Sequence, residues 1–404
     1  MTRIFSVLCL TFLALSFIQA QSCDYITPRY GVRSVKDIFV GTELDYRLTS
    51  TDLYMDIYYP VGSTEEKRPL VMMVFGGGFI SGKRQDMAPL CEEYAKRGFV
   101  AATIDYRIGF DGVSIIASDS AEVLRAGFRG AQDGKSALRF LKARHLEDSI
   151  DLERVWVGGA SAGSIVALAT AFFQSESDKP KEAGAIAPVG GRQRPDLGSI
   201  QGNRHLNGYD TKVQGVFNIF GALLSLNQLR PDNDMAVISY HQTQDPVVPC
   251  GINKPYYGTP LVAANYPTLY GTCAIESYMQ QLGVPSALHK TWIYNGTQHA
   301  VHDQNAVLQF FFESANPILC NAVSTREIHK KEFSLSPNPC ADFIYLSGDW
   351  QGASFRILDP GGVQLSSGVV SRDGALRTDH LTPGIYLLQI QSGSFTDHLK
   401  FIKQ

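Results

Sequence analysis

Strand-like and helix-like segments alternate along the chain between about residues 53 and 314. Short runs rich in Val, Ile and aromatic residues predict strands at residues 55–59, 70–75, 100–106, 155–157, 216–220, 237–240 and 291–294. Apolar residues at helical spacing predict helices at residues 88–97, 132–144, 165–174, 274–282 and 305–314. Almost continuously apolar strands are typical of a sheet that is covered on both faces. Their alternation with helices predicts an α/β fold with a mostly parallel, doubly wound sheet.

The pattern changes after residue 314. Polar residues predict a linker at 319–332, and short apolar runs follow at 333–335, 343–346, 354–358, 363–365, 385–390 and 398–402. Gly and Pro turns separate several of these runs, and no stretch between them has helical spacing. The pattern therefore predicts a small all-β sandwich domain over residues 333–404.

One stretch, at about residues 175–212, interrupts the alternation within the first domain. It is rich in Gly, Pro, Asp and Arg, and its periodicity is weak. Long irregular loops are commonly binding loops or lids, so we predict a lid-like insertion over the mouth of the sheet. A mobile surface excursion is an equally good interpretation of the same residues.

The first twenty residues have the pattern of a signal peptide. Arg3 supplies a positive charge, residues 4–18 are apolar, and Ala20 offers a cleavage point. The apolar stretch is shorter than a typical transmembrane helix. We therefore predict a signal peptide at 1–20, a first domain at 21–318 and export from the cytoplasm.

The charge balance excludes one class of partner. The formal net charge is -3, and the Lys and Arg residues are scattered, with no basic run. Nucleic acid is therefore not an expected partner.

Export changes the interpretation of the cysteines. Removal of the signal peptide leaves six, namely Cys23, Cys91, Cys250, Cys273, Cys320 and Cys340. An even number in an exported chain allows disulfides, but sequence does not choose among the pairings. Cys250 and Cys273 are the preferred pair because they would close a short loop. The alternative is that some cysteines are free, buried thiols.

The segment around Ser161 carries the main chemical signal. Gly159, Ser161 and Gly163 fit the pattern Gly-x-Ser-x-Gly, between a predicted strand and a predicted helix. This context is that of a nucleophile elbow, which presents a serine hydroxyl at the tip of a strained turn. A serine needs a histidine to take its proton and an acid to orient that histidine.

The candidate acid is Asp245, which follows the predicted strand at 237–240. Functional groups gather at the carboxyl ends of parallel strands, where Asp245 would lie. A turn-forming Asp before Pro is the structural alternative. Asp133 and Glu276 are other candidate acids, although a helix start explains Asp133 better.

The candidate base is His299, which follows the last predicted strand of the alternating region. His302 competes with it, but His302 and Asp303 look more like the opening of the next helix. Histidines at this spacing are weak grounds for a metal site, and there is no Cys-x-x-Cys zinc spacing. No metal or organic cofactor is expected.

A third component follows the predicted strand at 70–75. Gly76, Gly77, Gly78 and Phe79 come directly after it. Consecutive glycines let backbone N–H groups converge on one point, as the oxyanion of a tetrahedral intermediate requires. A phosphate loop is the alternative, but the spacing of a dinucleotide-binding or P-loop motif is absent from the sequence.

Together these residues resemble the α/β-hydrolase superfamily, and most closely its carboxylesterase branch related to hormone-sensitive lipase. The resemblance covers about residues 53–314, and residues 101–107 fit it as well. It implies a triad of Ser161, Asp245 and His299, with an oxyanion hole made by the N–H groups of Gly77, Gly78 and Ala162.

Two residues depart from the pattern of this branch. Phe75 stands where these esterases usually have a histidine that fixes the glycine loop, and Gln242 replaces a common glycine before the acid. Neither departure removes a reacting group.

The C-terminal domain resembles the sorting domain of the type IX (Por) secretion system. The matching segments are residues 336–339, 357–362, 381–388 and 400–403. The resemblance implies delivery through the periplasm to the cell surface or beyond, with the outer-membrane secretion machinery as partner. A generic sandwich that binds carbohydrate or anchors the enzyme is the alternative.

These observations predict an exported serine carboxylesterase that forms an acyl-enzyme. Its expected substrates are small or polymer-borne esters, with acylated carbohydrates as one class. A lipase or acyl-peptidase of the same fold is the enzymatic alternative. A surface binding or adhesion protein on a hydrolase scaffold is the non-enzymatic one.

Overall fold

The computed structural model describes residues 23–111, 119–230, 234–321, 335–347, 352–360, 363–371, 373–392 and 395–404. The predicted signal peptide and most of the predicted linker lie outside these residues. The described residues form two compact units, at 23–321 and 335–404. No helix in the described ranges is long and apolar enough to cross a membrane.

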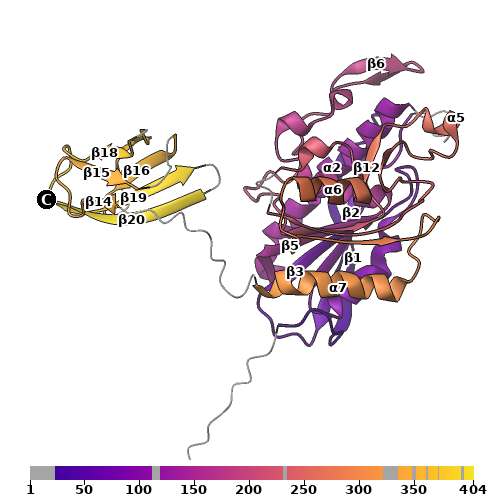
Figure 1. Cartoon of the computed structure of the whole chain (residues 1–404), viewed down its shortest axis with the longest axis horizontal. Coiled ribbons are helices and arrows are strands. Elements are labelled where there is room, and N and C mark those ends of the chain that lie inside the picture. The colour runs from indigo at the N-terminus through magenta and orange to yellow at the C-terminus, as the bar shows by residue number, and fades with distance from the viewer. Residues whose placement is uncertain are drawn as a thin grey trace, which may run out of the picture. The chain divides into compact units, whose positions relative to one another are not determined.

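The larger unit is built on an eight-stranded sheet in the order β1-β2-β4-β3-β5-β8-β10-β13 (Figure 1). Its strands are β1 (Gly31–Leu44), β2 (Ser50–Val61), β3 (Arg68–Val74), β4 (Val100–Ile104), β5 (Ile150–Ala160), β8 (Gly215–Ile219), β10 (Ala236–Gln242) and β13 (His289–Tyr294). β1 and β2 are antiparallel to their neighbours, and the strands from β4 to β13 are parallel. The predicted doubly wound α/β fold is confirmed.

Helices cover both faces of this sheet. They are α1 (Ala88–Ala95), α2 (Ser120–Ala143), α3 (His145–Asp148), α4 (Ala162–Phe172), α5 (Pro260–Ala263), α6 (Thr272–Gln281) and α7 (Gln304–Asn321). Tyr94 of α1 packs on Phe312 of α7 with ring centroids 4.9 Å apart. Figure 1 shows α7 on one side of the sheet, with α2 and α6 on the other.

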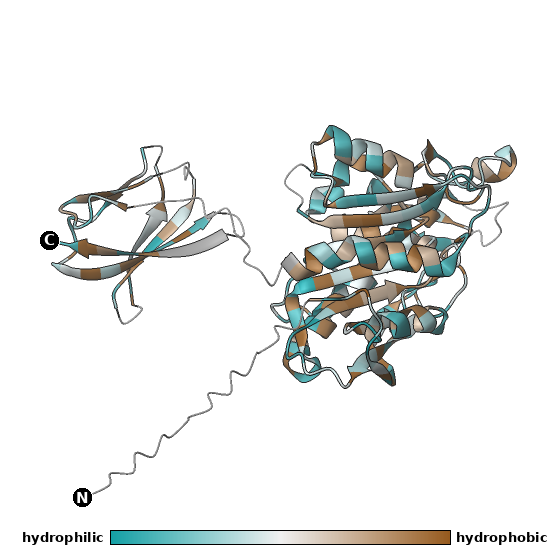
Figure 2. Ribbon diagram, turned by 60° about the horizontal axis from the view of Figure 1, so that its bottom comes forward, coloured by the Kyte–Doolittle hydropathy of each residue, from teal (hydrophilic) through white to brown (hydrophobic). Residues whose placement is uncertain are grey.

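The core of the larger unit lies between these layers. Every residue of β4 is buried, and so is every residue of β3 after Arg68. This explains why both strands are almost continuously apolar in sequence. Figure 2 shows that the covering helices carry both hydrophobic and hydrophilic residues.

Helix α2 begins twelve residues before its predicted start at residue 132. The cause is a set of buried charged residues, including Arg125 and Arg129, that breaks the apolar pattern of its first half. The guanidinium of Arg125 donates to the carbonyls of Glu182 and Gly184, both at 2.8 Å. Burial of this part of α2 therefore depends on partners from the 175–212 insertion.

The insertion runs along α2. It contains a hairpin of β6 (Ile186–Val189) and β7 (Arg192–Arg194), whose Arg194 pairs with Asp119 before α2. Further along, Gln132 and Arg139 of α2 donate to insertion carbonyls. These contacts hold the insertion against α2. Its function as a lid stays a prediction.

Short elements complete the larger unit. β9 (Ala222–Leu223), β11 (Ile252–Asn253) and β12 (Leu269–Gly271) form a small sheet of their own. Disulfides join Cys250 to Cys273 and Cys23 to Cys320. The preferred pair of the sequence analysis is thus confirmed. Cys91 and Cys340 are free and buried, as the alternative interpretation expects.

The smaller unit contains strands in two sheets, as the sequence predicts. The first sheet has β14 (Leu335–Ser336), β15 (Phe343–Leu346) and β18 (Ala375–Arg377). The second has β16 (Ser354–Leu358), β17 (Gln364–Val369), β19 (Gly384–Ser392) and β20 (Phe395–Lys403). Ile344, Ile357, Leu388 and Phe401 come from both sheets and are fully buried, so the unit has its own core.

Candidate active site

Ser161 lies at the turn between β5 and α4 with a φ of 56° and a ψ of -126°. A non-glycine residue with positive φ is strained, and such strain is typical of a nucleophile elbow. A Cβ on Gly163 would overlap the carbonyl oxygens of Val74 and Phe75, and one on Gly159 would overlap Gly163. Both glycines are therefore needed to let α4 start this close to the sheet.

His299 connects Ser161 to Asp245. Its Nδ1 lies 2.6 Å from Oδ2 of Asp245, and its Nε2 lies 2.7 Å from Oγ of Ser161. Because a carboxylate only accepts, Nδ1 carries the proton that it donates to Asp245. Nε2 is then free to accept the proton of the Ser161 hydroxyl. The structure thus brings together the three residues that the sequence analysis singled out.

Asp245 is held as an anion in a buried position. Its Oδ1 accepts hydrogen bonds from the N–H groups of Val247 at 2.8 Å and Val248 at 3.0 Å. Burial acts to raise the pKa of Asp245, but hydrogen bonds from His241, His299 and the Val247 N–H outweigh it. The pKa of Asp245 is therefore below its ordinary value, and the carboxylate stays ionised.

A second histidine, His241, lies next to the Asp245 carboxylate in addition to His299. The sequence analysis did not identify it. It is fully buried, and its Nε2 lies 2.9 Å from the carbonyl of Val248 and 3.4 Å from Oδ2 of Asp245. The Thr272 hydroxyl lies 2.8 Å from its Nδ1 and accepts a hydrogen bond from Asn218. The buried polar chain continues to Ser164 on α4, one turn after the elbow.

The glycine loop lies against the elbow. Gly77 and Gly78 have φ values of 116° and 62°, which favour glycine. The N–H groups of Ile80 and Ser81 and the Ser81 hydroxyl all donate to the Gly77 carbonyl at 3.1 Å. These bonds fix the loop in this chain, where Phe75 supplies no polar side chain. Phe75 instead packs on Tyr106, with ring centroids 4.5 Å apart.

The N–H groups expected to form the oxyanion hole belong to Gly77, Gly78 and Ala162. Within the described part of the chain, no acceptor is paired with any of the three. Ala162 opens α4, and the first N–H groups of a helix have no partner within the helix. These donors therefore have no partner within the described chain, and their role as an oxyanion hole stays a prediction.

His302 lies in a different environment from His299. Its Nδ1 is 2.8 Å from the Tyr240 hydroxyl, and its ring stacks on Tyr294 at a centroid distance of 3.8 Å. The ring is thus part of an aromatic cluster. Helix α7 begins two residues later, at Gln304, as the helix-opening interpretation of His302 expects.

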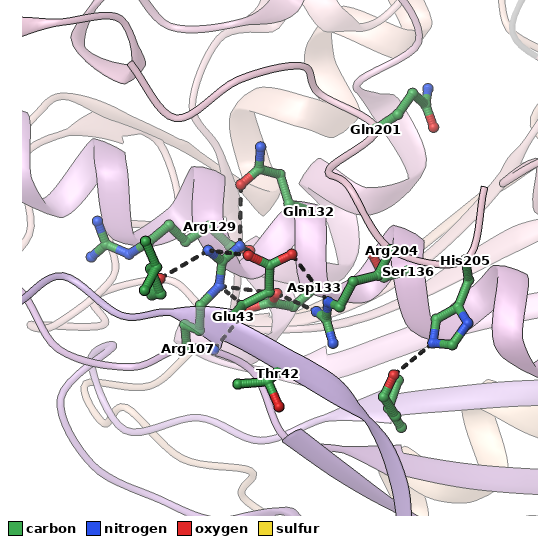
Figure 3. A network of polar contacts seen from close by, with 12 residues as sticks. Thr42, Glu43, Arg107, Arg129, Gln132, Asp133, Ser136, Gln201, Arg204 and His205 are labelled. Atoms are coloured by element: carbon green, nitrogen blue, oxygen red, sulfur yellow. Dashed lines mark hydrogen bonds and ion pairs between the residues drawn. The ribbon is translucent and has the colours of Figure 1, made fainter. Parts of the chain in front are cut away.

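The two other candidate acids have structural partners. Asp133 lies between Arg107 and Arg204, with nitrogen–oxygen distances of 2.9 and 2.7 Å (Figure 3). Glu276 accepts from the Thr291 hydroxyl at 2.7 Å and pairs with His289. In the described ranges, no group of three or more His, Cys, Asp or Glu residues could hold a metal ion.

Comparison with known proteins identifies both units. Residues 55–231 match the BD-FAE family, and residues 334–404 match the family described as the secretion system C-terminal sorting domain. The chain is also similar to Gut esterase 1 of Caenorhabditis briggsae, with 31% identity over 102 residues, which cover 25% of this chain and 17% of that protein.

Three further similarities are to larger or more distant proteins. The non-reducing polyketide synthase pkbA of Emericella nidulans is 31% identical over 158 residues, which are 38% of this chain. The chain spans only 6% of that synthase and 7% of a second one, from Preussia isomera. Among solved structures, propionate-bound esterase Est2 of Thermogutta terrifontis is 20% identical to this chain, with a TM-score of 0.43. The match covers 70% of this chain and 94% of the esterase chain.

The family matches agree with the sheet order, the elbow and the separate β-domain described above. The larger unit is therefore an esterase-like α/β-hydrolase domain that matches the BD-FAE family over residues 55–231, and the smaller unit is a C-terminal sorting domain of a secretion system.

Proposed function

We propose that the protein is an exported serine carboxylesterase. The observation that carries this proposal is the hydrogen-bonded chain from Asp245 through His299 to Ser161, at the tip of a strained elbow. The free N–H groups of Gly77, Gly78 and Ala162 support it, since they provide the second requirement of acyl transfer.

The reaction follows from these positions. His299 takes the Ser161 proton on Nε2 while Oγ attacks the ester carbonyl carbon. The resulting oxyanion is stabilised by the N–H groups of Gly77, Gly78 and Ala162, and Asp245 stabilises the imidazolium of His299. Collapse of the intermediate breaks the ester bond, and His299 gives its proton to the leaving alcohol. Water then attacks the acyl-enzyme with the same proton transfers and releases the acid.

Esters are proposed over amides because of the similarity to esterases, since the triad alone serves both substrate classes. Acylated carbohydrates are the proposed natural class, in keeping with an enzyme that acts outside the cell. Initial rates on aryl esters of increasing acyl length and on acetylated and feruloylated sugars test this class. Faster cleavage of long-chain lipid esters or acyl-peptides than of every sugar ester would contradict it.

The domain order fits export. We propose that residues 1–20 are a signal peptide, 21–318 the esterase domain, 319–332 a linker and 333–404 the sorting domain. The type IX machinery of the outer membrane would then recognise the last of these. In this proposal the 175–212 insertion contributes walls to the substrate site.

The variant Ser161→Ala tests the mechanism. It should abolish hydrolysis of short-chain aryl esters and covalent labelling by a fluorophosphonate probe, with an unchanged melting temperature. Activity of the Ser161→Ala protein close to that of the unmodified protein would refute the proposal. Absence of both hydrolysis and labelling in the unmodified protein would favour the binding-protein alternative.

A further inference from the structure

Gln242 stands where the resemblance expects a glycine, and it is the last residue of β10. Only 2% of its surface is exposed. Its Oε1 accepts a hydrogen bond from the N–H of Gln298 at 2.9 Å, and its Nε2 donates to the carbonyl of Ala300 at 2.8 Å. Gln298 and Ala300 are the immediate neighbours of His299, so one side chain holds the backbone on both sides of that histidine.

We infer that Gln242 is a positioning residue that fixes His299 between Ser161 and Asp245. The inference rests on the proposed function, and it assigns to this chain a clamp that a glycine at the same position could not provide.

The rest of the His299 loop is held by the same segment of chain. The N–H of Gln244 donates to the Gly296 carbonyl at 2.9 Å, and the Tyr240 hydroxyl accepts from the N–H of His302 at 3.2 Å. Residues 240–244 lead directly to Asp245. The acid and the loop that carries the base are therefore aligned by one short piece of β10 and its continuation.

The fit around Gln242 is close. A Cβ on Gly296 would overlap the Gln242 side-chain amide. Residue 296 therefore has to be glycine for the Gln242 side chain to fit in this position. Both polar atoms of the amide have a partner. An apolar side chain of the same length would leave the Gln298 N–H and the Ala300 carbonyl without these partners in a partly buried place.

The catalytic consequence follows from distance. The two hydrogen bonds of His299 are 2.6 and 2.7 Å long, and both depend on the position of one imidazole ring. A displacement of about 1 Å in such a group lowers the rate about 100-fold. Release of the backbone on both sides of His299 permits a displacement of this size without removing any reacting group.

The test compares Gln242→Met with Gln214→Met in the full chain. The Gln214 side chain accepts from the indole N–H of Trp156 at 2.8 Å. Gln214 precedes the amino end of β8, whereas Ser161 follows the carboxyl end of the neighbouring parallel strand β5. The control therefore removes a partly buried amide of the same type at the other end of these strands. Steady-state hydrolysis of a short-chain aryl ester gives kcat and KM. One-dimensional proton NMR follows the downfield resonance of the imidazole proton shared with Asp245.

Gln242→Met should lower kcat about 100-fold, with KM within about twofold, and should broaden or remove the imidazole resonance. Gln214→Met should keep kcat within about twofold and retain the resonance. Should Gln242→Met not fold, Gln242→Glu replaces it, because a carboxylate keeps the bond from Gln298 and loses the donation to Ala300. This variant should also lose most of kcat and the resonance.

Equal losses of kcat in the Gln242 and Gln214 variants, or an unaltered kcat and resonance in the Gln242 variant, would overturn the inference. The NMR readout needs no turnover. It therefore tests the clamp even if the unmodified protein hydrolyses no ester, a result that would reject the proposed function instead.

Discussion

The variant Asp245→Asn keeps the size of the side chain at residue 245 and removes its ability to accept hydrogen bonds on both sides. It therefore tests whether Asp245 orients His299. Oδ1 of Asp245 accepts two N–H bonds, from Val247 and Val248, and Oδ2 accepts the His299 proton. An asparagine can keep its oxygen on only one of these sides. With the oxygen toward Val247 and Val248, the amide N–H₂ faces Nδ1 of His299, which must then accept.

That arrangement forces the proton of His299 onto Nε2, where it faces Ser161 and blocks proton transfer. The opposite orientation leaves the Val247 and Val248 N–H groups facing an N–H₂ in a fully buried place. We therefore expect the first orientation and a decrease of kcat by about 10,000-fold, which corresponds to about 5 kcal/mol at the transition state.

The assay is steady-state hydrolysis of a short-chain aryl ester, with thermal unfolding of both proteins as the folding control. A kcat within tenfold of the unmodified protein would refute the assignment of Asp245 as the orienting acid. Asp133→Asn serves as the comparison, because its pairs with Arg107 and Arg204 are structural and its loss should affect stability before kcat.

The same residue predicts how stability depends on pH. The pKa of folded Asp245 is below its ordinary value of 3.8, so the ionised form is favoured by folding. This contribution is fully present above the unfolded pKa and is lost as the pH falls through the folded pKa. Denaturant unfolding of the unmodified protein and of Asp245→Asn should therefore show a stability difference that shrinks below about pH 4.

Three further predictions have distinct expected outcomes. His299→Ala should abolish hydrolysis and His302→Ala should retain it, as measured by kcat; loss of activity only in the second would show that the base is misassigned. Gly163→Ala should lower the free energy of unfolding by about 3 kcal/mol or more in denaturant titrations, because its Cβ would overlap two carbonyls. Replacement of Cys250 and Cys273 by serine should cost about 3 kcal/mol, from the loop that the disulfide closes, with unchanged stability arguing against the bond.

Sequence patterns predicted the elements whose neighbours are themselves apolar. The strands at 70–75 and 100–106 are predicted because nearly all of their own residues are apolar and buried. The first half of α2 was missed because Arg125 is buried against carbonyls of residues 182 and 184, far along the chain. β1 was missed for the opposite reason, since most of its side chains are exposed and leave no apolar pattern.

Some residues of the candidate site could be predicted from the sequence, and others depend on partners that are distant along the chain. Ser161 belongs to a local motif, and the chain order of Asp245 and His299 follows from the order of the strands that carry them. The partners of Gln242 are backbone groups that lie 56 and 58 residues away. Because every residue has such groups, the amino-acid types at those positions do not indicate the contact. Sequence alone could therefore identify Gln242 only as a departure from the expected glycine.

Phe75 is the second departure from the expected esterase pattern, and its consequence also depends on contacts that the sequence does not indicate. Loss of the expected histidine removes one way to hold the glycine loop, but Ser81 holds it with both its N–H and its hydroxyl. A Cβ on Gly82, the next residue, would overlap the Gly76 carbonyl and the Phe75 ring. The loop, the serine and the glycine after it thus form one compact unit in which the Phe75 ring packs against Tyr106 and the Gly82 backbone. A histidine introduced at residue 75 should consequently not raise kcat, since the bonds it would supply are already made by Ser81.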